Sequence, residues 1–161
     1  MIDFWSMVTL VKMTQAELEL YLGTAVQRLA DELMRANQWS RERSMTASLQ
    51  SFDALLPNRV VDSPNQFLWT ICADGANIGV LWFGIRGENE AVVWDIFIDP
   101  PGRNRGYGTE AMAAMEQELR KLNATSVTLS VFAGDSIASR MYRKLGYAPV
   151  STRMGKPLNQ D

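Results

Sequence analysis

Three short runs of alternating apolar residues, separated by very short turns, constrain the fold more than any other feature of the sequence. They cover residues 67–73, 77–85 and 91–98. Asp74-Gly75 separates the first two runs, and Gly87-Glu88-Asn89 separates the last two. Turns this short join neighbouring antiparallel strands. We therefore expect a three-stranded antiparallel meander in the middle of the chain.

Apolar residues at helical spacings of three and four flank this β region on both sides. The first helix is expected to begin at a capping box formed by Thr14 and Glu17, with its end near Asn37, and the second to run from Ser40 to Pro57. The other expected elements are strands at Met7–Met13, Ser126–Phe132 and Tyr147–Met154, and helices that end at Asn123 and Gly146. The order β-αα-βββ-α-β-α-β predicts an α/β (α+β) fold, in which helices flank a mixed, mostly antiparallel central sheet. We expect one domain over residues 1–161.

Composition excludes several kinds of chemistry. The chain has no histidine and a single cysteine, Cys72, so it cannot build a Ser-His-Asp triad, a histidine metal site or a cysteine-rich zinc site. We expect no metal, and the lack of an internal disulfide favours the cytoplasm. The net charge is −2, which does not suit a nucleic-acid partner. No apolar stretch approaches the ~20 residues of a membrane span, so we expect no membrane partner.

A glycine-rich turn lies between the third meander strand and the next helix. It reads Arg103-Asn104-Arg105-Gly106-Tyr107-Gly108-Thr109. Glycines there let the backbone approach an anion, and the N–H groups of a helix start point toward it. An ordinary loop with two incidental glycines is the alternative. The turn lacks the Lys-Ser/Thr ending of a P-loop, and Ala111 replaces the third glycine of a dinucleotide fingerprint.

Together with two other segments, this turn resembles the GNAT superfamily of N-acetyltransferases. Arg103-x-x-Gly106-x-Gly108 is similar to the family's Gln/Arg-x-x-Gly-x-Gly/Ala signature. The strand Asp95-Ile96-Phe97-Ile98-Asp99-Pro100 precedes it. Asp135-x-x-Ala138-x-x-Met141-Tyr142-x-x-x-Gly146-Tyr147 looks like the family's Asn-x-x-Ala-x-x-Leu/Met-Tyr-x-x-x-Gly-Phe segment, with Asp135 in place of the usual Asn.

The resemblance implies acetyl-coenzyme A as the acyl donor. It implies that backbone N–H groups of the glycine-rich turn bind the pyrophosphate, and that the Ile98 backbone binds the pantetheine where two strands splay apart. Asp135 can accept a hydrogen bond from pantetheine, although helix capping accounts for it equally well. The residues expected to bind the donor are Phe97, Ile98, Arg103, Asn104, Arg105, Gly106, Tyr107, Gly108, Thr109, Asp135 and Ala138.

Three side chains are candidates for the transfer chemistry. A primary amine with a pKa of ~10.4 is mostly protonated near pH 7, so it must lose a proton before it attacks a thioester. Asp95, which alternation places on one strand face with Val93 and Phe97, is the first candidate for the general base, and Glu90 is the second. Their alternatives are a surface or ion-paired carboxylate and ordinary turn polarity. Tyr142 is the candidate general acid; its helical spacing alone predicts a core aromatic, whereas the resemblance favours catalysis.

The expected activity is therefore acetyl transfer to a primary amine by direct attack on the thioester. Two alternatives remain: a non-catalytic module of the same fold that binds coenzyme A, and a protein that uses the turn for ATP or NAD. The sequence does not identify the acceptor, which is a small-molecule or peptide amine. By analogy with the family, Trp39 is a candidate for lining the acceptor side of the site. The resemblance also implies that the protein forms a homodimer.

Overall fold

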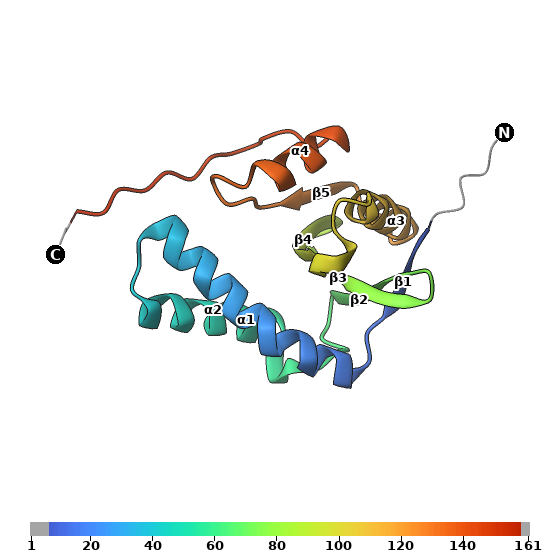
Figure 1. Ribbon diagram of the computed structural model, residues 1–161, viewed down its shortest axis with the longest axis horizontal. Coiled ribbons are helices and arrows are strands. Elements are labelled where there is room, and N and C mark those ends of the chain that lie inside the picture. Colours follow the sequence, from blue (N-terminus) through green and yellow to red (C-terminus); the bar gives the residue numbers. More distant parts are fainter. Residues whose placement is uncertain (1–6, 159–161) are drawn as a thin grey trace. The chain divides into compact units, whose positions relative to one another are not determined.

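The computed structural model describes residues 7–158 (Figure 1). These residues form two compact units. The first contains residues 7–18 and 60–130, and the second contains residues 19–59 and 131–158. The expectation of a single domain over residues 1–161 stays a prediction. Across the described residues, no helix combines the length and the apolar character that a membrane crossing requires.

A five-stranded sheet forms the first unit, and its strands follow one another in chain order (Figure 1). The first four strands pair antiparallel, and the fifth lies parallel to the fourth. The predicted meander and the mostly antiparallel sheet are thus confirmed. The strands are β1 (Val8–Lys12), β2 (Gln66–Ala73), β3 (Ala76–Arg86), β4 (Glu90–Ile98) and β5 (Ser126–Leu129).

The helix α3 (Tyr107–Lys121) packs against β1 and β4 and closes the core of this unit. The apolar stripe predicted for it consists of Met112, Met115, Leu119 and Leu122: the first two are completely buried and Leu119 nearly so, whereas Leu122, beyond the helix end, is 41% exposed. Phe83 of β3 is also fully buried. Burial of a side chain of this size stabilises the fold by about 1.5–3 kcal/mol. The start of α3 is therefore held in place by the same core that holds the sheet.

The capping box at the start of α1 (Gln15–Asn37) forms as predicted. The Thr14 N–H donates to Glu17 Oε2 at 2.8 Å, and the Glu17 N–H donates to Thr14 Oγ1 at 3.2 Å. The other carboxylate oxygen of Glu17 accepts from the hydroxyl of Thr70 on β2 at 3.3 Å. The backbone hydrogen bond from Thr14 lowers the pKa of Glu17 below its usual value.

In the second unit, α1 and α2 (Arg41–Leu55) lie side by side (Figure 1). Ser40 caps α2 as predicted, because its hydroxyl accepts from the Arg43 N–H at 3.2 Å. Apolar residues at helical spacing, Met45, Leu49, Phe52 and Leu56, predicted the inner face of α2; Phe52 and Leu56 are buried, and Met45 and Leu49 are half-buried. Ser44 and Ser48 are buried, and the Ser48 hydroxyl donates to the Val26 carbonyl of α1 at 2.7 Å. A small hydroxyl side chain that bonds to backbone is covered easily, so polarity alone did not predict the burial of Ser48. A short 3₁₀ turn, Pro57–Arg59, follows α2.

The prediction of a last strand at Tyr147–Met154 is wrong. Residues 147–158 have no strand structure, and the side chains of Val150 and Met154 are 87% and 89% exposed. Alternating polarity indicates a strand only when a ladder partner buries one face, and Pro149 has no N–H to donate. The strand expected over Ser126–Phe132 also ends early, at Leu129. The helix α4 spans Ser136–Lys144, and Gly146, with φ of +92°, terminates it as predicted.

Candidate active site

The strand β4 contains a bulge at Trp94. Trp82 of β3 faces Asp95, whereas the next residue, Phe83, faces Val93, so Trp94 is an extra residue. Residues that face each other across a ladder share one side of the sheet, which puts Val93 on the side of Ile96 rather than on that of Asp95. Simple alternation, which grouped Val93 with Asp95, is therefore wrong across this point. The only sequence sign of the bulge is an unbroken apolar run at residues 91–94.

The two neighbours of β4 separate after Val93. The ladder with β5 covers only Glu90–Val93, whereas β3 follows β4 as far as Ile98. The contact at that far end is close, because a Cβ atom on Gly79 of β3 would overlap the carbonyl oxygen of Phe97. The end of β4 therefore packs closely against β3 on one side. On its other side it makes no ladder with β5.

A compact turn connects β4 to α3. It starts as the 3₁₀ turn Pro100–Gly102, in which the Gly102 N–H donates to the Asp99 carbonyl at 2.8 Å. Gly102 is buried, and a Cβ atom there would lie 3.2 Å from Cγ2 of Ile98 and 3.7 Å from Cδ2 of Tyr107. The turn therefore keeps the end of β4 and the first residue of α3 close together.

The first turn of α3 has no side-chain cap. Gly106 is the N-cap residue, with φ of +80°, and no side chain accepts a hydrogen bond there. Asn104 also has a positive φ, of +61°. A Cβ atom on Gly106 would meet no atom within 4 Å, so the space beside this backbone is open. The N–H groups of a helix start carry a partial positive charge, and together with the exposed Arg103 and Arg105 they make this end of α3 suitable for an anion.

The two candidate carboxylates lie at different places on β4. Glu90, at its start, accepts two hydrogen bonds from the Arg86 guanidinium, both at 3.2 Å, and one from the Thr128 hydroxyl at 3.2 Å. The hydrogen bonds from Arg86 lower the pKa of Glu90 below its usual value. Asp95 is half-buried beyond the bulge, in the part of β4 that has left β5. Because a lower pKa makes a weaker base, the contact with Arg86 disfavours Glu90 as a proton acceptor.

The third candidate segment lies in the second unit, around α4. Asp135 caps this helix, since its Oδ1 accepts from the Ala138 N–H at 2.9 Å. The alternative role of Asp135, helix capping, is therefore present in the structure. Tyr142 is buried, and its ring meets that of Tyr147 edge to face, with centroids 5.9 Å apart. The Tyr147 N–H donates to the Tyr142 carbonyl at 3.0 Å, which fixes this pair at the helix end.

The predicted site residues thus divide between the two units. The first unit brings together Asp95, the end of β4 and the whole turn from Arg103 to Thr109. The second unit contains Asp135, Ala138 and Tyr142. Sequence reasoning missed the bulge at Trp94, whose only sign is the apolar run at residues 91–94, and the close contact at Gly79, which no motif marks.

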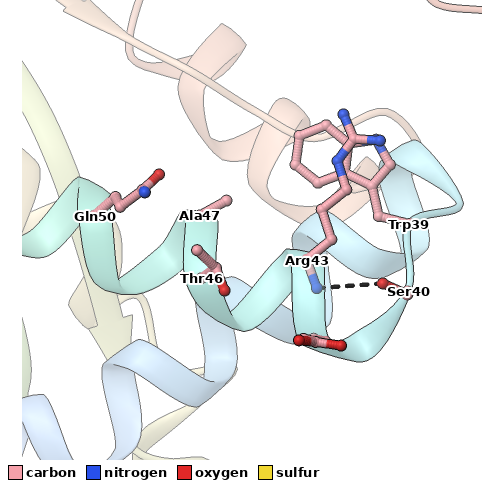
Figure 2. A pocket seen from close by; sticks show the side chains of 7 residues that line it. Trp39, Ser40, Arg43, Thr46, Ala47 and Gln50 are labelled. Atoms are coloured by element: carbon pink, nitrogen blue, oxygen red, sulfur yellow. Dashed lines mark hydrogen bonds between the residues drawn. The ribbon is translucent and has the colours of Figure 1, made fainter.

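A shallow pocket of about 420 Å³ lies on α2 within the second unit (Figure 2). The Arg43 guanidinium lies over the Trp39 ring, 4.1 Å from its centroid. Trp39 was expected on the acceptor side; this pocket places one cation, Arg43, and one carboxylate, Glu42, beside it, and the expectation stays a prediction. The pocket is lined by Trp39, Ser40, Glu42, Arg43, Thr46, Ala47 and Gln50.

Known proteins share this sequence and this architecture. Residues 26–147 match the Acetyltransferase (GNAT) family. The chain is 30% identical to YdgE of Bacillus subtilis (strain 168), named an uncharacterized N-acetyltransferase, over 93% of this chain and 98% of that one. The crystal structure of YycN from Bacillus subtilis, which is 29% identical, superposes with a TM-score of 0.88 and covers 95% of this chain and 99% of that one.

A more distant structure adds a ligand to the comparison. AAC(6')-Iy, solved in complex with the bisubstrate analogue CoA-S-monomethyl-acetylneamine, is 15% identical, with a TM-score of 0.62 over 95% of this chain and 99% of that one. At this identity the likeness concerns the fold alone. The sequence match, the relatives and the mixed sheet with its flanking helices agree, and the chain belongs to the GNAT family of acetyltransferases.

Proposed function

We propose that the protein transfers an acetyl group from acetyl-coenzyme A to a primary amine. The observation that carries the proposal is the arrangement of the first unit. The end of β4 no longer pairs with β5, and one compact turn connects it to the start of α3. That helix start has no side-chain cap. An extended thioester-bearing chain with a diphosphate needs these two features side by side: an open strand edge and an anion-binding helix start.

The residues of this region fit such a donor. The N–H groups from Arg103 to Thr109 would hold the diphosphate, and the open space beside Gly106 leaves room for its oxygens. Phe97 and Ile98 would supply backbone hydrogen bonds to the pantetheine arm. Asp135 and Ala138 are the proposed donor contacts of the second unit, although the Asp135 carboxylate already accepts from the Ala138 N–H. Acetyl-coenzyme A, when bound, supplies an activated acetyl group and a thiol leaving group.

The chemistry of the chain's own residues concerns two protons. Only about one lysine-like amine in two thousand is neutral at pH 7, so removal of a proton is part of the reaction. We assign its acceptance, directly or through a water molecule, to the carboxylate of Asp95. We assign the proton for the departing sulfur to the Tyr142 hydroxyl, because a phenol strengthens its hydrogen bond as negative charge develops on its partner.

A screen of amines with acetyl-coenzyme A tests the proposal. Thiol release and the mass of the acetylated product are measured together for amino acids, polyamines, peptides and aminoglycosides. The proposal expects turnover of at least one class, and loss of turnover in the Tyr142→Phe variant. Coenzyme A binding without turnover of any amine would instead identify a non-catalytic module of the same fold. Preference for ATP or NAD in competition binding would reject the donor itself.

A further inference from the structure

The side chain of Arg103 folds back over the end of β4. Its Nε–H donates to the Ile98 carbonyl at 2.9 Å, and its guanidinium carbon lies 5.1 Å from the centre of the Phe97 ring. The residue itself is exposed. The first position of the glycine-rich turn therefore does more than add charge beside the helix start, because its side chain occupies a backbone acceptor of the preceding strand.

The Ile98 carbonyl, which accepts from Arg103, points to the side of β4 on which the ladder with β5 has ended. The Asp99 N–H donates to the Ile78 carbonyl of β3 at 2.8 Å. In a trans peptide the N–H of one residue and the C=O of the residue before it point in opposite directions. The Ile98 carbonyl therefore points away from β3, toward the side where the β4–β5 ladder has ended. An extended ligand lying along β4 would use this acceptor first.

We propose that Arg103 is a positioning residue that exchanges partners when the donor binds, an inference that rests on the proposed function. Without donor, its guanidinium holds the Ile98 carbonyl. With donor, an amide N–H of the pantetheine arm takes that carbonyl, and the guanidinium turns to the diphosphate at the start of α3. Hydrogen bonds between two charged partners are stronger than those to a neutral carbonyl, and guanidinium binds phosphate oxygens through two parallel N–H groups.

The exchange couples the two ends of the donor. A ligand with a diphosphate draws Arg103 away and frees the Ile98 carbonyl, whereas a ligand without phosphate must compete with the guanidinium for it. Removal of the guanidinium should then have opposite effects on the two ligands. It should weaken coenzyme A, which loses a phosphate contact, and strengthen pantetheine, which gains an unoccupied acceptor. A residue that merely supported the turn would weaken both ligands when removed.

The experiment measures binding of coenzyme A and of pantetheine, which has no phosphate, by calorimetry and NMR titration. Arg103→Met keeps an apolar stem for the Phe97 ring and removes every donor. Arg105→Met is the matched control, since it removes the other exposed guanidinium of the same turn. We expect Arg103→Met to weaken coenzyme A at least tenfold and to tighten pantetheine severalfold. Arg105→Met should weaken coenzyme A without tightening pantetheine.

Three further outcomes complete the test. The exchange is overturned if pantetheine binds Arg103→Met no more tightly than it binds the wild type. The same holds if pantetheine binds neither protein. The thermal midpoint of Arg103→Met shows whether that variant folds normally, and Arg103→Lys replaces it in the test if it does not. Lysine keeps a cation that can reach the phosphates, so Arg103→Lys should retain most of the coenzyme A affinity. A loss of affinity in Arg103→Lys as large as in Arg103→Met overturns the phosphate contact. Failure of coenzyme A to bind the wild type would reject the proposed function instead, so the two failures are distinguishable.

Discussion

Replacement of Gly106 by alanine tests the proposed donor-binding region most directly, because the structure separates its effect on the fold from its effect on the ligand. Gly106 has φ of +80°, and an added Cβ atom would meet no protein atom within 4 Å. Alanine therefore introduces no clash in the free protein. It does introduce backbone strain, because a left-handed conformation costs a residue with a Cβ atom about 1–2 kcal/mol.

The loss of donor affinity follows from what the new methyl group would displace. If the diphosphate lies against this backbone, the methyl group occupies its place, and at least one hydrogen bond to a charged oxygen is lost. Such a bond contributes about 1.5–3 kcal/mol, which corresponds to about a 10- to 100-fold weaker affinity. Valine at the same position should abolish binding, because it is larger and its β-branch adds strain.

Gly75→Ala is the matched control for strain. Gly75 has φ of +77° in the turn between β2 and β3, and an added Cβ atom there also meets nothing within 4 Å. Urea unfolding should show a similar loss of stability for the two variants. Calorimetry should show a loss of coenzyme A affinity for Gly106→Ala alone. Equal stability losses with unchanged affinity in both variants would refute the location of the diphosphate.

Three other outcomes are expected. Tyr142→Phe keeps the buried ring and should lower kcat about ten- to a thousandfold with little change in coenzyme A affinity; an unchanged kcat removes the proposed acid. Asp95→Asn should depress the rate with a basic amine most at low pH, where more of the amine is protonated, and a loss that does not vary with pH indicates a structural carboxylate. Glu17→Gln should cost about 0.3–1 kcal/mol at neutral pH. Because the folded-state pKa of Glu17 is lowered, that contribution is present above the unfolded-state pKa and is lost as the pH falls through the folded value, so urea unfolding should show a larger difference at pH 7 than at pH 3.

Local patterns predicted those parts of the fold that local chemistry determines. The capping box at Thr14 and Glu17 involves four consecutive residues, so its sequence carries all the information that it needs. The turns at Asp74-Gly75 and Gly87-Glu88-Asn89 fixed the meander for the same reason. The glycine-rich turn was likewise placed correctly between β4 and α3.

Features that depend on distant partners were not predictable in this way. The bulge at Trp94 exists only relative to the register of β3, and the burial of Ser48 on α2 depends on a carbonyl of α1. The expected strand at Tyr147–Met154 had the right alternation but no ladder partner among the described residues. For the candidate site, the sequence named candidate residues that stay predictions, whereas the hydrogen bonds of Glu90 to Arg86 and of Arg103 to Ile98 required coordinates.

The glycine at position 79 has an effect beyond its own strand, β3. The carbonyl of Phe97 fits against β3 only because nothing projects from that position, so even one methyl group would push the tip of β4 outward. The reach of an acyl chain lying along that tip would change with it. If the proposed donor lies along β4, the depth at which its thioester is presented would be set partly by Gly79 of β3, which itself would touch neither substrate.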